Sequence, residues 1–555
     1  MPKSLFSKRI EKLSIDIAFI RKNVKFSIKF FLGLSIGFFI IFQGVNILLS
    51  STYNHNLRLF LLWVKNWFIG ASQPPIMTSV LFYFKKLCIR TSIISCAIGL
   101  VSTVFLVRKS NVATEEVVRG ARKADKKTIR NLQKGRIPVG DVTIPVEYEN
   151  RGTLVLGAAG TGKSVLVRDV IQSLANDKCI IYDRKGEFLQ KFYREGDLIL
   201  NFLDARNVDW NIYEEIKTDE DIDSISSSIV PHTGDDRSKF WYNSARDLIE
   251  VVLEAVRRSE VKADFSHLAT FMFETNTKEK LFEELKQYKD LISRVEGYIS
   301  DKSQTATSIF ASYTEYANYF RNKALLSSKG GKFSVRDYIK NKEDKRRIFI
   351  INPANVESFR GLNTLFLDLA FKEILSLPDD IERRIFVIID EFPSLYKLDS
   401  LERLLAEGRS KGACPLISAQ DFTQIERIYE AGAASIFNNA NTKAIFRLAE
   451  TKSAKYISEW LGEQEKKELD ESLSQGTAEM RDGYYYKESK KIEKLYLPAE
   501  IANLEDLNFV FKVGPYPPYK TKVTYKEYPE VAEGFIPAKI EDKKIGGEND
   551  VAMLS

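Results

Sequence analysis

The stretch from Thr153 to Leu174 limits the possible fold of this chain more than any other part of the sequence. Residues 153–156 predict a short buried strand, and an amphipathic helical pattern with Leu166, Val170 and Leu174 on one face follows a glycine-rich loop. A strand, such a loop and a helix in this order are the context in which a P-loop folds. The loop consists of Gly157, Ala158, Ala159, Gly160, Thr161, Gly162, Lys163 and Ser164.

Each residue type in this loop suits phosphate binding. Gly157 and Gly162 let the backbone curl until its N–H groups point inward, and Lys163 reaches the β- and γ-phosphates. The Ser164 hydroxyl can take one position on Mg²⁺. We therefore expect residues 157–164 to bind ATP with Mg²⁺. A merely flexible loop is the less favoured interpretation, because it does not account for the strand and helix on either side.

Two apolar runs near the start of the chain predict membrane spans. Phe30 to Leu49 is twenty residues without a charge, and Thr91 to Val107 is a second uncharged run that extends back to Leu87. A signal peptide is the rival reading of the first run, but 29 residues of mixed character precede it. We expect transmembrane helices at 30–49 and 87–107.

The distribution of lysine and arginine orients these spans. Eight basic residues precede Phe30, four lie between the spans, and Arg108 opens a further basic stretch. By the positive-inside rule both termini are cytoplasmic, which makes 1–29 a cytoplasmic segment and 50–86 a periplasmic loop. The four cysteines form no C-x-x-C pair and the three histidines are scattered, so the sequence suggests neither a zinc site nor a disulfide framework.

The rest of the chain predicts an α/β domain interrupted by helices. Short continuous apolar runs at 179–183, 348–352, 385–390 and 415–420 are typical of parallel strands that are buried on both faces. Between them, 213–340 has helical spacing only. We expect a basic, solvated stem at 108–136, a motor domain at 137–212 and 341–530, an inserted all-α domain at 213–340, and a flexible tail at 531–555.

Polar residues end several of these expected strands. Ligands of parallel sheets bind at the carboxyl ends of the strands, so Asp183, Asp390 and Gln420 are expected to converge on the triphosphate. Asp390 would hold Mg²⁺, while the adjacent Glu391 orients and deprotonates the attacking water. Gln420 fits a sensor of the γ-phosphate, with a solvent-facing amide as the alternative.

Arg409 lies between the Asp390 and Gln420 strands, where we expect a loop. Its guanidinium would neutralise charge at a neighbouring subunit's site during hydrolysis. A surface salt bridge or a DNA phosphate contact is an equally good reading. Arg447, at the end of the run 444–446, is a second candidate for the same role.

These motifs together carry a resemblance to a known family. The P-loop, Ile181 to Phe188, Leu203 to Arg206, Phe240-Trp241, Asp390-Glu391 and Gly408 to Gln420 resemble the type IV secretion coupling proteins, most closely the TraD branch of F-type conjugation systems. Similar segments at 481–483, 514–517 and 535–537 extend the likeness over nearly the whole chain.

The resemblance implies a RecA-like and FtsK-like P-loop ATPase with a mostly parallel sheet, anchored in the bacterial inner membrane as a homo-hexamer. It also implies that the ring passes relaxase-bound single-stranded DNA to type IV secretion channel components. Lys163, Ser164, Asp390, Glu391, Gln420 and Arg409 match the family's catalytic pattern. The long acidic tail of the F-type branch is missing before Ser555, which leaves recruitment of the accessory partner open.

Other functions remain open at this stage. A platform that delivers protein effectors to the same secretion system would share the fold, and so would a double-strand DNA pump of the chromosome-segregation class. No winged-helix pattern of the latter class is visible near the carboxyl end. A nucleotide-gated transporter is the least favoured, because two spans leave little room for a substrate path.

Overall fold

The computed structural model describes residues 115–231, 239–260, 262–328, 330–352, 357–474 and 483–540, together with five positions between 62 and 70. The spans expected at 30–49 and 87–107 lie outside these residues. Within the described part, no helix combines the length and apolarity needed to cross a bilayer. Contacts divide the chain into Met1–Glu116 with Lys467–Lys490, and a larger unit of Val117–Lys466 with Lys491–Ser555.

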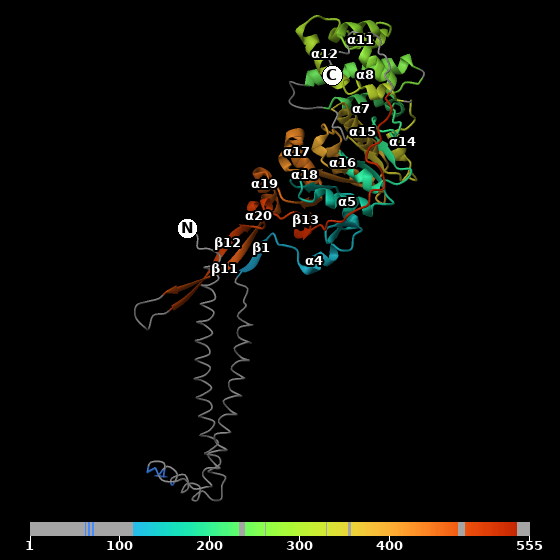
Figure 1. The fold of residues 1–555 in the computed structure, drawn as a ribbon. Helices are drawn as coiled ribbons and strands as arrows, with labels where there is room; N and C mark the ends of the chain where they lie inside the picture. Colours follow the sequence, from blue (N-terminus) through green and yellow to red (C-terminus); the bar gives the residue numbers. More distant parts are fainter. Residues whose placement is uncertain are drawn as a thin grey trace. The chain divides into compact units, whose positions relative to one another are not determined.

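A nine-stranded sheet forms the centre of the larger unit, in the order β14-β13-β10-β4-β9-β8-β5-β7-β6. Neighbouring strands from β10 to β6 run parallel, whereas β13 pairs antiparallel with both β10 and β14. All five expected strands are present, so the prediction of a mostly parallel α/β sheet is confirmed (Figure 1). The strands are β4 (Thr153–Leu156), β5 (Lys178–Tyr182), β6 (Leu198–Leu200), β7 (Ile348–Ile350), β8 (Ile385–Ile389), β9 (Ala413–Ala419), β10 (Thr442–Ile445), β13 (Asn508–Val513) and β14 (Tyr519–Lys522).

The central strands are buried on both faces, because their side chains alternate between two hydrophobic layers. In β4, Leu154 and Leu156 belong to one core cluster and Val155 to the other. The Val155 face is covered by α5 (Lys163–Ser173), α6 (Glu187–Phe192) and the hairpin of β2 (Ile137–Val139) and β3 (Val142–Ile144). The opposite face is covered by α15 (Glu357–Ser376), α16 (Leu401–Lys411), α17 (Phe422–Tyr429) and α18 (Gly432–Asn439). The remaining short elements are η1 (Val146–Tyr148), η3 (Phe392–Ser394), α19 (Thr451–Leu461) and α20 (Pro498–Ala502).

Between η2 (Ile212–Glu215) and residue 340 the described residues form helices, with a single bridge from Trp210 to Phe333. The helices α8, α11 and α12 gather at one end of the unit, beyond α7 and α15 (Figure 1). The helices of this region share a hydrophobic core with the sheet. Within this core, the ring centroid of Trp210 lies 5.1 Å from that of Phe265 in α9 and 5.0 Å from that of Phe366 in α15. The helices are α7 (Asp219–Ile229), α8 (Lys239–Ser259), α9 (Phe265–Glu274), α10 (Lys278–Leu285), α11 (Lys289–Ile299), α12 (Gln304–Ala317), α13 (Lys323–Leu326) and α14 (Val335–Lys340).

The segment expected to be a solvated stem has regular structure where it is described. β1 (Glu115–Gly120) pairs with β11 (Glu463–Ser474), which pairs with β12 (Gly483–Lys494). α4 (Lys126–Asn131) follows, and the Asp125 side chain caps it by accepting from the Thr128 N–H at 2.8 Å. The partner strand is more than 300 residues away in the sequence, so composition alone did not reveal this pairing.

The last described residues also differ from the expectation of a flexible tail. Residues 524–540, here called the C-terminal strap, run in an extended conformation past α5 and α6 (Figure 1). The N–H of Val531 donates to the Gln190 carbonyl at 2.7 Å, and the N–H of Ala538 donates to the Leu203 carbonyl, also at 2.7 Å. Glycine and dense charge in the sequence indicated disorder. The structure supplies backbone partners that only the folded domain brings within reach.

Candidate nucleotide-binding site

The P-loop, Asp390 and Gln420 lie together at the carboxyl edge of the parallel sheet. Each follows directly on a strand: the loop on β4, Asp390 on β8 and Gln420 on β9. The three strands are adjacent, with Leu156 in register with Ala419 and Ile389 with Ile417. Tertiary structure thus unites residues that are far apart in the sequence, as the polar strand ends predicted.

The P-loop is held from several sides before it reaches α5. The N–H of Gly157 donates to the Ala419 carbonyl at 3.2 Å, and the N–H of Ala158 donates to the Arg447 carbonyl at 2.8 Å. Only glycine fits at position 157, because a Cβ there would lie 2.5 Å from the Cβ of Phe446. Gly162 has φ of +112° and precedes the first turn of α5. These constraints keep the loop curled at the helix amino terminus, where anions bind.

Lys163 lies at the centre of the site. Its side chain is buried, and its Nζ donates to the carbonyls of Gly157 and Ala158, the latter at 3.2 Å. Burial lowers the pKa of Lys163, while the charges of Glu391 and Asp390 oppose that shift. The ammonium is therefore bound to the loop backbone and interacts electrostatically with the two acidic residues.

The acidic pair is held in a constrained geometry. Asp390 Oδ1 accepts a hydrogen bond from the Ser418 hydroxyl at 2.8 Å, and the N–H of Glu391 donates to the same hydroxyl at 3.0 Å. Burial raises the pKa of Asp390, which the Ser418 hydrogen bond and Lys163 oppose. Burial likewise raises the pKa of Glu391, against the charge of Lys163 and a side-chain hydrogen bond with Gln420. A carboxylate with a raised pKa is a better proton acceptor, as a general base requires.

Asp183 lies at the same edge but differs from its expected role. Its carboxylate accepts the N–H groups of Gly186, Phe188 and Leu189 at 3.0, 2.7 and 2.8 Å. Burial raises the pKa of Asp183 to about 7, and the backbone donors oppose the shift. Both oxygens are therefore used in holding the start of α6, so Asp183 shapes the turn beside the site and does not point at a triphosphate.

Arg409 does not lie on a loop, contrary to the expectation. It is an exposed residue in the last turn of α16, just before β9 begins, and its carbonyl accepts from Asn150 Nδ2 at 3.3 Å. This is the amino edge of the sheet, opposite to the P-loop of the same chain. The apolar spacing from Leu401 to Leu405 continues to Gly408, so the helix extends through Arg409.

Arg447 has a different position from Arg409. It lies two residues after the end of β10, and its carbonyl accepts from the Ala158 N–H of the P-loop at 2.8 Å. Its Nη2 lies 2.9 Å from Asp506 Oδ1. The two candidate arginines thus lie at opposite edges of the sheet.

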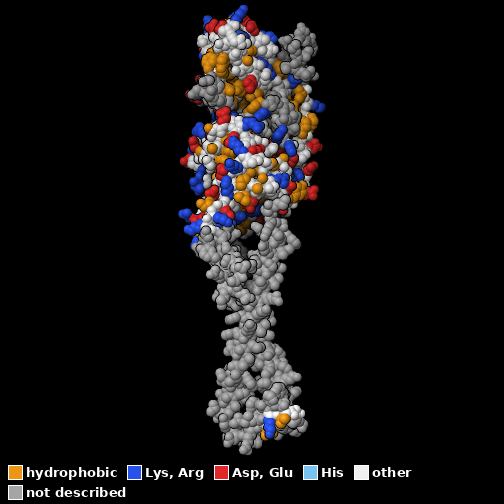
Figure 2. Space-filling view, turned by 90° about the vertical axis from the view of Figure 1, so that its left-hand side faces the viewer, with side chains coloured by type: hydrophobic (Ala, Val, Ile, Leu, Met, Phe, Trp, Pro, Cys, Tyr) orange, Lys and Arg blue, Asp and Glu red, His pale blue; other side chains and the backbone are white. Residues whose placement is uncertain are grey.

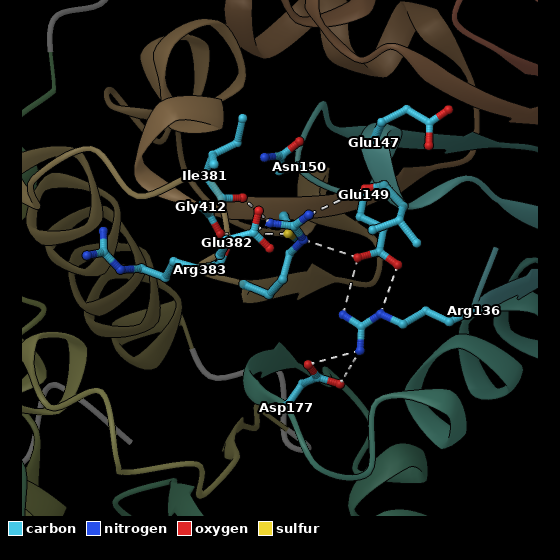
Figure 3. Close-up of polar contacts among 12 residues, drawn as sticks. Arg136, Glu147, Glu149, Asn150, Asp177, Ile381, Glu382, Arg383 and Gly412 are labelled. Atoms are coloured by element: carbon cyan, nitrogen blue, oxygen red, sulfur yellow. Dashed lines mark hydrogen bonds and ion pairs between the residues drawn. The ribbon is translucent and has the colours of Figure 1, made fainter.

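A surface cavity of about 510 Å³ lies at the amino edge, near the first residues of β5 and β8. Figure 3 shows Arg136 paired with Glu149 and Asp177 beside this cavity. Arg136 lies 2.8 Å from Glu149 and 2.9 Å from Asp177, and Arg384 lies 3.1 Å from Glu149. Because ligands of open α/β sheets bind at the carboxyl edge, this cavity is not the nucleotide site.

Surface charge does not identify a partner. On the face shown in Figure 2, Lys and Arg side chains are interspersed with Asp and Glu. The net charge of +7 is small for 555 residues.

Two residues that support the site were missed from the sequence. Ser418 belongs to an apolar run that predicts only a buried strand. A serine within that run, two positions before Gln420, nevertheless indicates a polar contact near the site. Leu507 donates its N–H to the Thr161 carbonyl at 2.8 Å from a left-handed conformation with φ of +66°. Nothing in the sequence distinguishes that leucine, because its position depends on the strand pairing of β13 with β10.

Comparisons with known proteins agree with this geometry. The family model of the type IV secretion-system coupling protein DNA-binding domain matches residues 136–524. Coupling protein TraD of Escherichia coli strain K12 is 31% identical over 456 residues, which make up 78% of this chain and 62% of TraD. The chain thus spans less than two thirds of that relative's length.

Solved structures of conjugative coupling proteins are also similar to this chain. The unbound bacterial conjugative coupling protein TrwBdeltaN70 has a TM-score of 0.62 and 26% identity, covering 76% of this chain and 96% of that one. TrwB in complex with ADP and Mg²⁺ has a TM-score of 0.61 at 26% identity, covering 76% and 98% of the two chains. A further TrwB structure, with a non-hydrolysable ATP analogue, matches with the same values.

Proposed function

The chain belongs to the type IV secretion coupling protein family, and on that premise we propose that it is a membrane-anchored, ATP-driven DNA translocase. It couples relaxase-bound single-stranded DNA to a type IV secretion channel in conjugative transfer. One observation carries the ATPase part of the proposal: the P-loop, Asp390-Glu391 and Gln420 end three adjacent parallel strands. TrwB, which is similar over most of this chain, has been solved with ADP and Mg²⁺ and with an ATP analogue.

The residues of the site have distinct roles in this proposal. Residues 157–164 bind the triphosphate, and Lys163 neutralises charge on its β- and γ-phosphates. Ser164 and Asp390 offer a hydroxyl and a carboxylate oxygen, the donors that Mg²⁺ prefers, so they suit a bound metal. When bound, Mg²⁺ supplies charge neutralisation at the phosphates. Glu391 orients and deprotonates water, and Gln420, which influences the pKa of Glu391, senses the γ-phosphate.

Arg409 acts on a neighbouring subunit in this proposal. Its side chain is exposed at the amino edge, across the sheet from its own P-loop, so it serves catalysis only through an adjacent copy in a homo-hexameric ring. Arg447 beside its own P-loop is the alternative arginine.

The proposed placement in the cell rests on the sequence. Spans at 30–49 and 87–107 anchor the ring in the bacterial inner membrane with both termini in the cytoplasm. The helices of 213–340 form the domain that receives the relaxase-bound strand, and the motor domain comprises 137–212 and 341–530.

The test measures ATP hydrolysis by the full-length chain with and without single-stranded DNA. Lys163→Ala is expected to abolish hydrolysis, while the control Lys452→Ala, whose side chain is 67% exposed on α19, retains it. Hydrolysis that survives in Lys163→Ala would refute the P-loop assignment. Hydrolysis that is insensitive to DNA would instead favour an effector-delivery platform.

The role of Arg409 requires a mixing experiment. Arg409→Ala subunits are combined with Glu391→Gln subunits, so that some interfaces contain both wild-type residues. Restored hydrolysis supports action across the interface, and no complementation contradicts it. Lys163→Ala mixed with Glu391→Gln is the control, because both changes damage the same site and no restoration is expected.

A further inference from the structure

Ser418 connects the two acidic residues of the site through one hydroxyl. Its side chain is fully buried on β9, between β4 and β8, with its Cα in register with that of Val155. The hydroxyl donates to Asp390 Oδ1 at 2.8 Å and accepts from the Glu391 N–H at 3.0 Å. One small group thus contacts the side chain of one acid and the backbone of the next.

The hydrogen bond from the Glu391 N–H to Ser418 stabilises a strained backbone conformation of Glu391. Glu391 has φ of +59°, and residues other than glycine rarely adopt this left-handed region. Such conformations persist only where surrounding contacts hold them. The Ser418 hydroxyl holds the Glu391 N–H from one side, and the Ser394 N–H holds its carbonyl at 2.9 Å from the other. The resulting turn keeps the Glu391 side chain near Gln420, which opposes the rise of its pKa.

The hydrogen bond from Ser418 to Asp390 affects the residue assigned to Mg²⁺. A hydroxyl that donates to one carboxylate oxygen fixes the rotation of the carboxylate and leaves the other oxygen for a further partner. If a buried serine in a strand had only a packing role, a backbone carbonyl would suffice as the acceptor for its hydroxyl. Here the acceptor is the carboxylate assigned to Mg²⁺, on the neighbouring strand.

We propose that Ser418 is a positioning residue of the nucleotide site. Its hydroxyl orients Asp390 toward Mg²⁺ and holds Glu391 in the conformation that faces water and Gln420. This inference rests on the proposed ATPase function. It adds that Ser418, a residue outside the P-loop and the acidic pair, governs how nucleotide binding depends on Mg²⁺.

The test uses the full-length chain and Ser418→Ala, which removes the hydroxyl and little volume. Partners that orient metal ligands typically contribute 10–100-fold in metal affinity or activity. We expect the Mg²⁺ concentration for half-maximal binding of a fluorescent ATP analogue to rise by about tenfold or more. Binding of the same analogue in EDTA should stay unchanged, because the P-loop contacts are intact. Ser418→Thr, which keeps the hydroxyl, should recover much of the wild-type Mg²⁺ dependence.

Two controls separate positioning from loss of stability. Ser458→Ala removes another fully buried hydroxyl, which donates to the Tyr496 carbonyl at 2.6 Å, and should leave Mg²⁺ dependence unchanged. Asp390→Asn combined with Ser418→Ala should have the same Mg²⁺ requirement as Asp390→Asn alone, since the serine influences the metal through that carboxylate.

The possible outcomes distinguish this inference from the proposed function. If Ser418→Ala has the wild-type Mg²⁺ requirement while the wild type binds nucleotide in a Mg²⁺-dependent way, the positioning role is wrong and the ATPase function stands. If the wild type itself binds no nucleotide, or Lys163→Ala binds as well as wild type, the proposed function fails instead.

Discussion

Replacing Tyr528 by phenylalanine removes one hydrogen bond between the C-terminal strap and α5. The Tyr528 hydroxyl donates to Asp169 Oδ1 at 2.7 Å, and its ring packs edge-on against Phe192 with 5.0 Å between centroids. Burial, followed by the hydrogen bond to Asp169, raises the pKa of Tyr528 above its ordinary value of 10, so the phenol keeps its proton at neutral pH. The ring contact survives in the phenylalanine variant.

The free energy lost with this hydrogen bond depends on its acceptor, the carboxylate of Asp169. A hydrogen bond to a charged group stabilises by about 1.5–3 kcal/mol. Asp169 is only 6% exposed, so water replaces the lost partner poorly, but Lys526 Nζ remains 3.1 Å away. We therefore expect the free energy of opening the strap to fall by about 2 kcal/mol. Since about 1.4 kcal/mol corresponds to tenfold, the open population should rise about 30-fold.

Amide hydrogen exchange measures this opening directly. The N–H groups of Val531, Ala532, Ile536 and Ala538 are hydrogen-bonded to Gln190, Asp204 and Leu203, so they exchange when the strap opens. Their protection should fall about 30-fold in Tyr528→Phe. Protection of Phe509 and Phe511 in β13 should not change.

Tyr525→Phe is the matched control. Its side chain is 58% exposed and its ring lies 5.9 Å from the Arg168 guanidinium, a contact that phenylalanine preserves. We expect its exchange to equal that of the wild type. A change below about threefold in Tyr528→Phe would mean that the bond to Asp169 does not hold the strap, and the reasoning would be refuted.

Three other predictions concern the core and the P-loop. Glu215→Ala leaves the buried donors Trp210 Nε1 and Ser334 Oγ without their carboxylate, and should lower the free energy of unfolding in urea by about 4 kcal/mol. Burial lowers the pKa of Lys443 to about 7, so between pH 7 and 10.5 only the unfolded chain holds this proton and folding stability rises with pH. The stability advantage of Lys443→Met should therefore shrink over that window, by up to about 1.4 kcal/mol per pH unit. Gly157→Ala should weaken nucleotide binding about tenfold or more, because the new Cβ meets Phe446 at 2.5 Å.

Each of these has its own check. Glu214→Ala, whose side chain is 40% exposed, should change stability by less than about 0.5 kcal/mol. A Lys443→Met advantage that stays constant with pH would contradict the lowered pKa of the buried lysine. For the P-loop, Gly297→Ala on α11 has open space for a Cβ and should bind nucleotide normally. Equal affinities of the two alanine variants would contradict the steric argument.

The sheet was predictable because burial on both faces leaves continuous apolar runs. Every run that ends in a polar residue proved to be a parallel strand, and the P-loop, Asp390 and Gln420 followed from those ends. Asp183 shared the same signal, yet its carboxylate caps α6. A strand-end position gives the edge of the sheet on which a residue lies, but the partner of its side chain depends on neighbouring backbone.

The sequence did not reveal where long-range pairing supplies the backbone partners of a segment. β1 and the strap look polar and charged in sequence, and both are fixed by main-chain hydrogen bonds to distant segments. Arg409 is expected on a loop because it lies between two strands, whereas packing of Leu401, Leu404 and Leu405 continues the helix through it.

The sequence by itself predicted the P-loop motif between strand and helix, the fold class and the family, because backbone curvature at glycine and apolar periodicity are local properties. Tertiary structure alone decided that Ser418 contacts both acids, that Glu391 adopts a left-handed turn, and that Arg409 lies across the sheet from its own P-loop. The physical reason is that these features depend on strand order. Strand order reflects which buried faces pack best together, and no single segment contains that information.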